Sequence, residues 1–127
     1  MLLILRERRE ISWCPVICSI RPRVGLRGYT RWVECDEIDL ELDNRSKIMF
    51  ALAGKAAEAV CFNYGPGFID KLISSDSSDL ALVRSLTNDE QVMKTLFRLT
   101  YGELKLQWAR HQILREKLTR QRALYFL

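Results

Sequence analysis

The residues best suited to covalent or metal chemistry in this chain are four cysteines and one histidine. Nucleophilic catalysis would need a cysteine thiolate beside His111, but the apolar residues near the cysteines favour the neutral thiol. A structural zinc site usually draws on Cys-x2-Cys pairs, and this spacing does not occur among Cys14, Cys18, Cys35 and Cys61. We therefore predict reduced thiols, no bound metal, no cofactor and no catalytic activity.

A second group that could do chemistry is a row of six acids between Glu34 and Asp43. Ile38, Leu40 and Leu42 alternate with acids, which predicts a half-exposed strand whose carboxylates share one face. Such carboxylates could bind a metal or transfer protons, but arginines on neighbouring strands would also neutralise them. We predict a solvated or salt-bridged face, with a protein-docking surface as the alternative.

Residues 21–32, RPRVGLRGYTRW, combine four arginines, two glycines and two aromatic residues. Arginine binds phosphate through a planar fork, and an aromatic ring can stack on a nucleic-acid base. The alternative is a surface turn whose arginines pair with the acidic stretch. As RNA or DNA contacts in this region we predict Arg21, Arg23, Arg27, Tyr29 and Arg31.

The stretch from Trp108 to Leu127 is strongly basic and ends in five uncharged residues. Its cations surround much of a predicted helix, whereas a helix packed fully into a core has a cleaner apolar stripe. The phosphate contacts predicted here are Arg110, Arg115, Arg120 and Arg122. Because burial stabilises large apolar side chains, the tail should dock on its own core or on another subunit. The predicted partner-binding residues are Trp108, Leu124, Tyr125, Phe126 and Leu127.

The fold must position these groups. The residue pattern predicts an α+β fold. Residues 11–20 and 29–35 are rich in β-branched and aromatic residues, which favours strands. Because Pro15 cannot donate to a ladder, the first should be an edge strand or be interrupted there. We expect a small N-terminal antiparallel β-sheet followed by a C-terminal helical region that ends in a long basic helix. A single domain would cover residues 1–127, mainly β over 1–43 and mainly α over 44–127.

Local signals place the helices of the second part. A helix capped by Asn44 or Ser46 should run to about Phe62 and end at Gly65, because glycine tolerates a left-handed turn. Short helices are predicted over 67–74 and 80–86, the latter capped by Asp79. Thr87 and Glu90 have the spacing of a capping box for a long helix, which Gly102 could kink or break.

Two functions from different classes fit these features. The first is a non-catalytic nucleic-acid-binding protein, with RNA favoured over DNA, or a component of a larger ribonucleoprotein or viral particle. The second is an assembly subunit whose basic helix binds an acidic protein partner. Its apolar tail would fill a pocket of a neighbouring subunit, most simply in a homodimer. The opening residues MLLILRERRE lack the pattern of a secretory signal, and no apolar run is long enough for a membrane span. We therefore expect a soluble protein of a reducing intracellular compartment, without a membrane partner.

Overall fold

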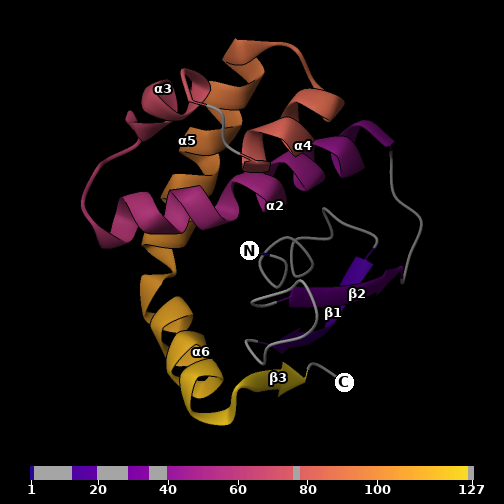
Figure 1. Ribbon diagram of the computed structural model, residues 1–127, viewed down its shortest axis with the longest axis vertical. Coiled ribbons are helices and arrows are strands. Elements are labelled where there is room, and N and C mark those ends of the chain that lie inside the picture. Colours follow the sequence, from indigo (N-terminus) through magenta and orange to yellow (C-terminus); the bar gives the residue numbers. More distant parts are fainter. Residues whose placement is uncertain (2–12, 20–28, 35–39, 76–77, 126–127) are drawn as a thin grey trace. The chain divides into compact units, whose positions relative to one another are not determined.

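The computed structural model describes residues 1, 13–19, 29–34, 40–75 and 78–125 (Figure 1). The chain forms two compact units. The helical unit runs from Asp39 to Leu106 and includes Met1. The terminal unit combines Leu2–Ile38 with Gln107–Leu127, so both ends of the chain contribute to it. The prediction of a single domain over 1–127 stays a prediction.

Four helices make up the helical unit: α2 (Leu40–Cys61), α3 (Phe68–Ile73), α4 (Ser78–Leu86) and α5 (Glu90–Leu106). α2 packs mainly against α5 and α4, and α3 also contacts α5 (Figure 1). All four helices contribute to the largest fully buried apolar side chains, which are Leu52, Ile69, Leu80, Val83 and Phe97. Ala56 and Ala59 are also fully buried, and their small side chains let neighbouring helices approach α2 closely.

The ends of α2 and the start of α5 are set by local backbone chemistry. After Cys61 the chain turns through positive φ at Asn63 (57°) and Gly65 (78°), which confirms the predicted stop. The N-cap of α5 is Asp89, whose Oδ1 accepts a hydrogen bond from the Gln91 N–H at 2.9 Å. The predicted capping box of Thr87 and Glu90 is therefore wrong, and Thr87 instead accepts from the Asp89 N–H.

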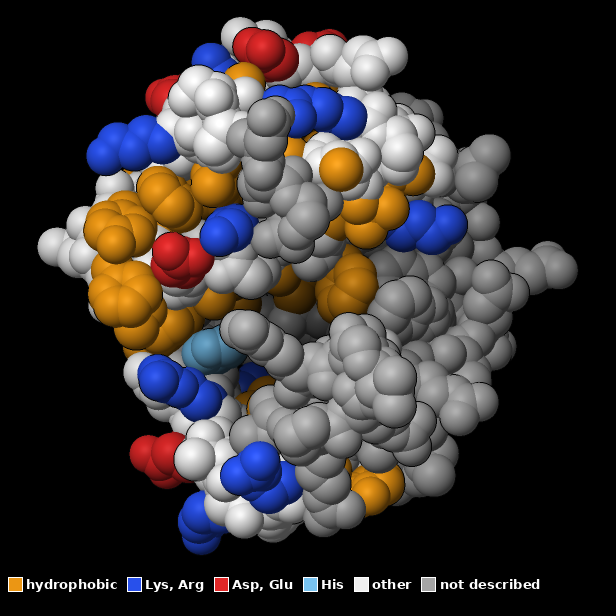
Figure 2. All heavy atoms as spheres, viewed as in Figure 1, with side chains coloured by type: hydrophobic (Ala, Val, Ile, Leu, Met, Phe, Trp, Pro, Cys, Tyr) orange, Lys and Arg blue, Asp and Glu red, His pale blue; other side chains and the backbone are white. Residues whose placement is uncertain are grey.

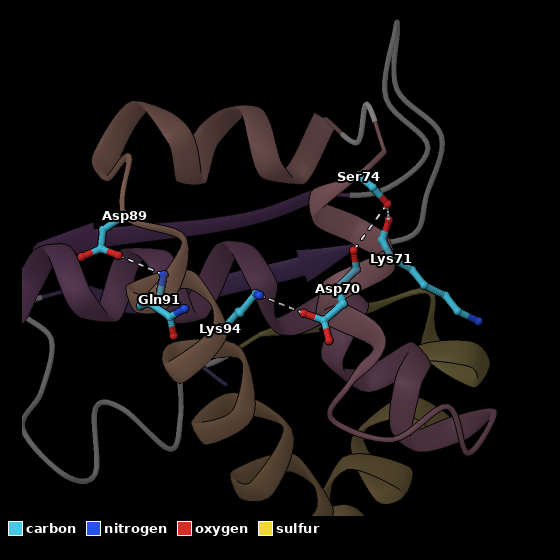
Figure 3. A network of polar contacts seen from close by, with 6 residues as sticks. All are labelled: Asp70, Lys71, Ser74, Asp89, Gln91 and Lys94. Carbon is cyan, nitrogen blue, oxygen red and sulfur yellow. Dashed lines mark hydrogen bonds and ion pairs between the residues drawn. The ribbon is translucent and has the colours of Figure 1, made fainter.

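One polar network ties α3 to α5 (Figure 3). Lys94 Nζ lies 3.2 Å from Asp70 Oδ1 and bridges the two helices. The Ser74 hydroxyl donates to the Lys71 carbonyl at 3.0 Å, which supports the last turn of α3. Because the Asp70 side chain is well exposed, solvent screens this ion pair and its contribution to stability is small. The buried apolar contacts are the main source of stability in this unit.

The terminal unit contains strands β1 (Trp13–Ser19), β2 (Tyr29–Glu34) and β3 (Ala123–Tyr125) and helix α6 (Trp108–Gln121). The strands are antiparallel in the order β2-β1-β3. The register of β1 against β2 shifts between Pro15 and Ile17. β1 continues through Pro15 as the central strand, so the predicted edge position is wrong. The irregular register at this point fits a residue that has no N–H to donate to the ladder. Cys18 lies opposite Thr30 on one side and Leu124 on the other.

The predicted fold class is wrong. The described residues are mostly helical, and the short strands do not form a sheet confined to the N-terminal region, since β3 comes from the C-terminal end. The chain also continues past its basic helix into that strand.

The clearest local error concerns the acidic stretch, where α2 already begins at Leu40. Leucine and glutamate favour helix, and acids in a first helical turn are stabilised by the helix dipole. A two-residue alternation over six residues was too short to outweigh these effects. Asn44 and Ser46 consequently lie inside α2 rather than at its cap, and Asp79 lies within α4.

α5 continues without a break through Gly102 to Leu106, and the helical path is interrupted only at Gln107, before α6. The break therefore falls five residues after the predicted one. Among the described residues, no helix is long and apolar enough to cross a membrane.

Gly54 offers a simple test of the α2 assignment. It is exposed in the middle of α2, and an added Cβ would meet no heavy atom within 4 Å. Gly54→Ala should raise the free energy of unfolding by about 0.8–1 kcal/mol, because alanine loses less backbone entropy in a helix. Urea titration followed by circular dichroism measures this change. Gly65→Ala is the matched control and should destabilise, because Gly65 has a φ of +78°.

Candidate nucleic-acid interface

The candidate interface is one face of α6. Gln112, Arg115, Glu116, Thr119 and Arg120 recur at helical spacing and line a hollow of about 560 Å³. Arg115 and Arg120 are exposed, and within the described part of the chain neither takes part in an ion pair. The Thr119 hydroxyl donates to the Arg115 carbonyl at 2.9 Å, so it does not occupy either guanidinium. Two guanidinium groups are therefore free to bind an anion at this face.

The first turn of α6 is more constrained than its middle. The rings of Trp108 and His111 stack with centroids 4.6 Å apart and an interplanar angle of 19°. Arg110 Nη1 donates to Gln107 Oε1 at 3.3 Å, which ties this half-buried arginine to the residue before the helix. Arg110 is therefore less available to a ligand than Arg115 and Arg120.

Burial and the nearby Arg115 guanidinium lower the pKa of His111 from its usual 6.5. Both effects disfavour a positively charged imidazole. His111 is consequently neutral at physiological pH and adds no charge to the basic face. Its ring serves as a flat apolar partner for Trp108.

The last turn of α6 directs the chain into β3. Arg122 has a left-handed backbone (φ 67°), and its N–H donates to the Leu118 carbonyl at 2.7 Å. This conformation ends the helix and lets Ala123 and Leu124 become buried, with 3% and 9% of their surfaces exposed. Two of the five tail residues whose docking the sequence predicts, Ala123 and Leu124, are thus buried in a strand that pairs with β1.

The two units differ in their balance of basic and acidic residues. The terminal unit contains twelve arginines and lysines against six acids, whereas the helical unit contains eight against ten. The basic N-terminal stretch and the basic helix are distant in sequence, yet they belong to the same unit. Figure 2 shows mostly blue side chains over the part of the surface where α6 lies. A concentration of one charge of this kind attracts polyanions.

The predicted phosphate-binding residues are distributed unevenly in the structure. Arg115 and Arg120 are brought to one hollow, and Arg122 is exposed at the C-cap of α6, two residues after Arg120. The backbones of Tyr29 and Arg31 lie in β2, opposite Ser19 and Ile17 of β1. The other members of the predicted set, Arg21, Arg23 and Arg27, lie outside the described residues.

The predicted partner-binding residues also differ in their surroundings. Trp108 is half-buried against His111, and Leu124 is buried in β3. Tyr125 is 66% exposed and remains accessible to a partner. Phe126 and Leu127 lie outside the described residues.

Sequence reasoning missed two features of the surface. Gln112, Glu116 and Thr119 line the hollow with the arginines, and their helical spacing could have revealed this shared face. The second feature is an aromatic cluster after α2, in which the Tyr64 ring lies 5.7 Å from Phe62 and 4.9 Å from Phe68. Both Phe62 and Tyr64 are more than half exposed. The sequence signal for this cluster was the presence of three aromatic residues around a glycine-proline turn.

The structure describes the side chains of two of the cysteines. Cys18 and Cys61 are free thiols, and they belong to different units. Within the described residues, no group of three or more potential metal ligands lies together. The predictions of no metal and no catalytic activity stay predictions. Comparison of the chain with protein families, with curated proteins and with solved structures found no match.

Proposed function

We propose that this chain is a non-catalytic nucleic-acid-binding protein whose terminal unit binds the phosphate backbone of RNA. The observation that carries the proposal is the pair of exposed guanidinium groups of Arg115 and Arg120, which line one hollow and form no ion pair within the described residues. A guanidinium presents paired N–H donors that match two phosphate oxygens. The strong excess of cations in this unit supports the proposal further.

The mode of binding follows from the residue types on this face. Arginine contacts to phosphate position a protein on nucleic acid but do not read base sequence. Gln112 and Thr119 add neutral hydrogen-bonding groups beside the arginines, and these could contact phosphate or sugar hydroxyls. We therefore propose binding with little sequence preference, in a reducing intracellular compartment that keeps the Cys18 and Cys61 thiols free. Such a protein would function within a larger ribonucleoprotein or viral particle.

The second candidate is an assembly subunit that binds an acidic protein. The exposed Tyr125 and the same basic face of α6 favour it. Complementary charge increases the rate of such association. If the partner is a protein, the purified chain should form a discrete complex that survives nuclease treatment and contains no nucleic acid.

Salt dependence tests the proposal on the full chain. Labelled single-stranded RNA, single-stranded DNA and duplex DNA should each increase in fluorescence anisotropy as protein is added at low salt. Each phosphate contact contributes about 0.7–0.9 to the slope of log affinity against log salt. Engagement of Arg115 and Arg120 alone therefore predicts a slope of about −1.4 to −1.8. No binding to any probe at low salt would contradict the proposal.

A further inference from the structure

Glu116 places a carboxylate among the described side chains that line the hollow on α6. It follows Arg115 directly and lies four residues before Arg120. A glutamate four residues before an arginine is well placed to pair with it on a helix surface. Glu116 is nevertheless exposed and forms no ion pair within the described residues. Its carboxylate is therefore available to a ligand that enters the hollow.

The hollow thus presents charged groups with opposite hydrogen-bonding roles. A guanidinium only donates hydrogen bonds, whereas an ionised carboxylate only accepts them. Phosphodiester oxygens accept hydrogen bonds and carry negative charge, so they match Arg115 and Arg120 but are repelled by Glu116. A ligand that satisfies all three side chains must present a hydrogen-bond donor close to a phosphate group.

RNA has this combination in every nucleotide. The ribose carries its 2′-hydroxyl on the carbon next to the one that bears the 3′-phosphate, and this hydroxyl can donate as well as accept. DNA has the phosphate without the hydroxyl. Residues four apart on a helix have Cβ atoms about 5–6 Å from each other. The long side chains of Glu116 and Arg120 can therefore reach neighbouring groups of one nucleotide.

We propose that Glu116 gives this face a preference for RNA over DNA, by accepting a hydrogen bond from a ribose 2′-hydroxyl beside the phosphates that Arg115 and Arg120 bind. This inference rests on the proposed nucleic-acid binding and adds the residue that determines sugar specificity. A carboxylate accepts short, strong hydrogen bonds from a hydroxyl. With DNA, the same carboxylate faces phosphate without a donor, so the preference combines attraction for RNA with repulsion of DNA.

Anisotropy titrations of the full chain with three single strands test the role of Glu116. The strands are RNA, 2′-fluoro-RNA and DNA of one base sequence without uracil or thymine, and the fluoro strand keeps the sugar pucker of RNA but lacks the hydroxyl. The unmodified chain should bind RNA about tenfold more tightly than 2′-fluoro-RNA, as expected for one hydrogen bond to a charged group. Glu116→Ala should bind all three strands about equally, mainly because its affinity for 2′-fluoro-RNA and DNA increases.

Two further variants separate this role from a general effect of charge. Glu116→Gln keeps an oxygen that can accept a hydrogen bond but removes the charge, so it should retain a smaller preference for RNA. Glu90→Ala is the matched control, because Glu90 is exposed in the first turn of α5, in the helical unit. It changes the net charge as Glu116→Ala does, and it should leave the preference for RNA unchanged.

The outcomes distinguish this inference from the proposed function. Equal affinity of the unmodified chain for RNA and 2′-fluoro-RNA would overturn the role of Glu116 and leave the proposed function intact. A preference for RNA that survives Glu116→Ala would overturn it too. The same holds for a preference that persists in the fluoro strand and changes with base sequence, since Glu116 would then contact a base edge. Absence of binding to every strand would overturn the proposed function and this inference together.

Discussion

Replacement of both Arg115 and Arg120 by glutamate is expected to reduce the affinity for single-stranded RNA by at least about 100-fold at low salt. A hydrogen bond to a charged group contributes about 1.5–3 kcal/mol, and each reversal also replaces attraction for phosphate by repulsion. Both residues line the same hollow, so a single ligand strand would lose both contacts. The loss should be similar for different base sequences, because phosphate contacts carry no sequence information.

The matched control reverses the charge of two basic residues outside α6. Arg45 and Lys71 are exposed on α2 and α3 of the helical unit, and Arg45→Glu with Lys71→Glu changes the net charge by the same amount. This control should lose far less affinity if binding is local to α6. Equal losses in the two double variants would show that net charge alone determines binding, and would remove α6 as the interface.

A conservative variant separates charge from geometry. Arg115→Lys with Arg120→Lys keeps both charges but removes the planar fork that binds two phosphate oxygens together. We expect an intermediate affinity with nearly unchanged salt dependence, measured by the same anisotropy titration.

Phe97→Ala is expected to destabilise the helical unit by about 3–5 kcal/mol, because it removes a large ring and leaves a cavity. Phe97 is fully buried on α5, the helix that packs mainly against α2. This loss is a large part of the 5–15 kcal/mol that typically stabilises a domain. Urea denaturation followed by circular dichroism should show a much lower midpoint or an unfolded unit at room temperature.

Leu82→Ala provides the comparison for that measurement. Leu82 is 53% exposed on α4, so its truncation should change the free energy of unfolding by less than about 0.5 kcal/mol. A Phe97→Ala variant that is no less stable than Leu82→Ala would contradict the packing described for α2, α4 and α5.

Some parts of the fold were predictable because their causes are local. α3 lies almost where the sequence places it, and α2 ends before Gly65 because glycine allows the left-handed turn there. The same local reasoning failed for the acidic stretch before Asn44. A short alternation of leucines and acids fits the first turn of a helix as well as it fits a strand, and α2 extends through it.

The candidate site was also predicted only in part. The sequence correctly predicted that Arg115 and Arg120 are exposed, because exposure follows from a basic helix with a narrow apolar strip; their role as phosphate ligands stays a prediction. It did not identify Gln112, Glu116 and Thr119 as their neighbours at the hollow. It also did not show which large apolar residues of α5 are buried and which, like Leu99, are exposed, since only packing distinguishes them.

The sequence alone thus determined the helical stretches from about residue 46 onward, the stop at Gly65 and the basic character of both ends. These properties depend on neighbouring residues within a few turns. Tertiary structure alone decided that both basic ends belong to one unit and that Ala123–Tyr125 forms a strand against β1. It likewise decided that Leu99 faces solvent while Phe97, two residues earlier, fills the core. Those outcomes depend on contacts between residues far apart in the chain, which local propensity does not encode.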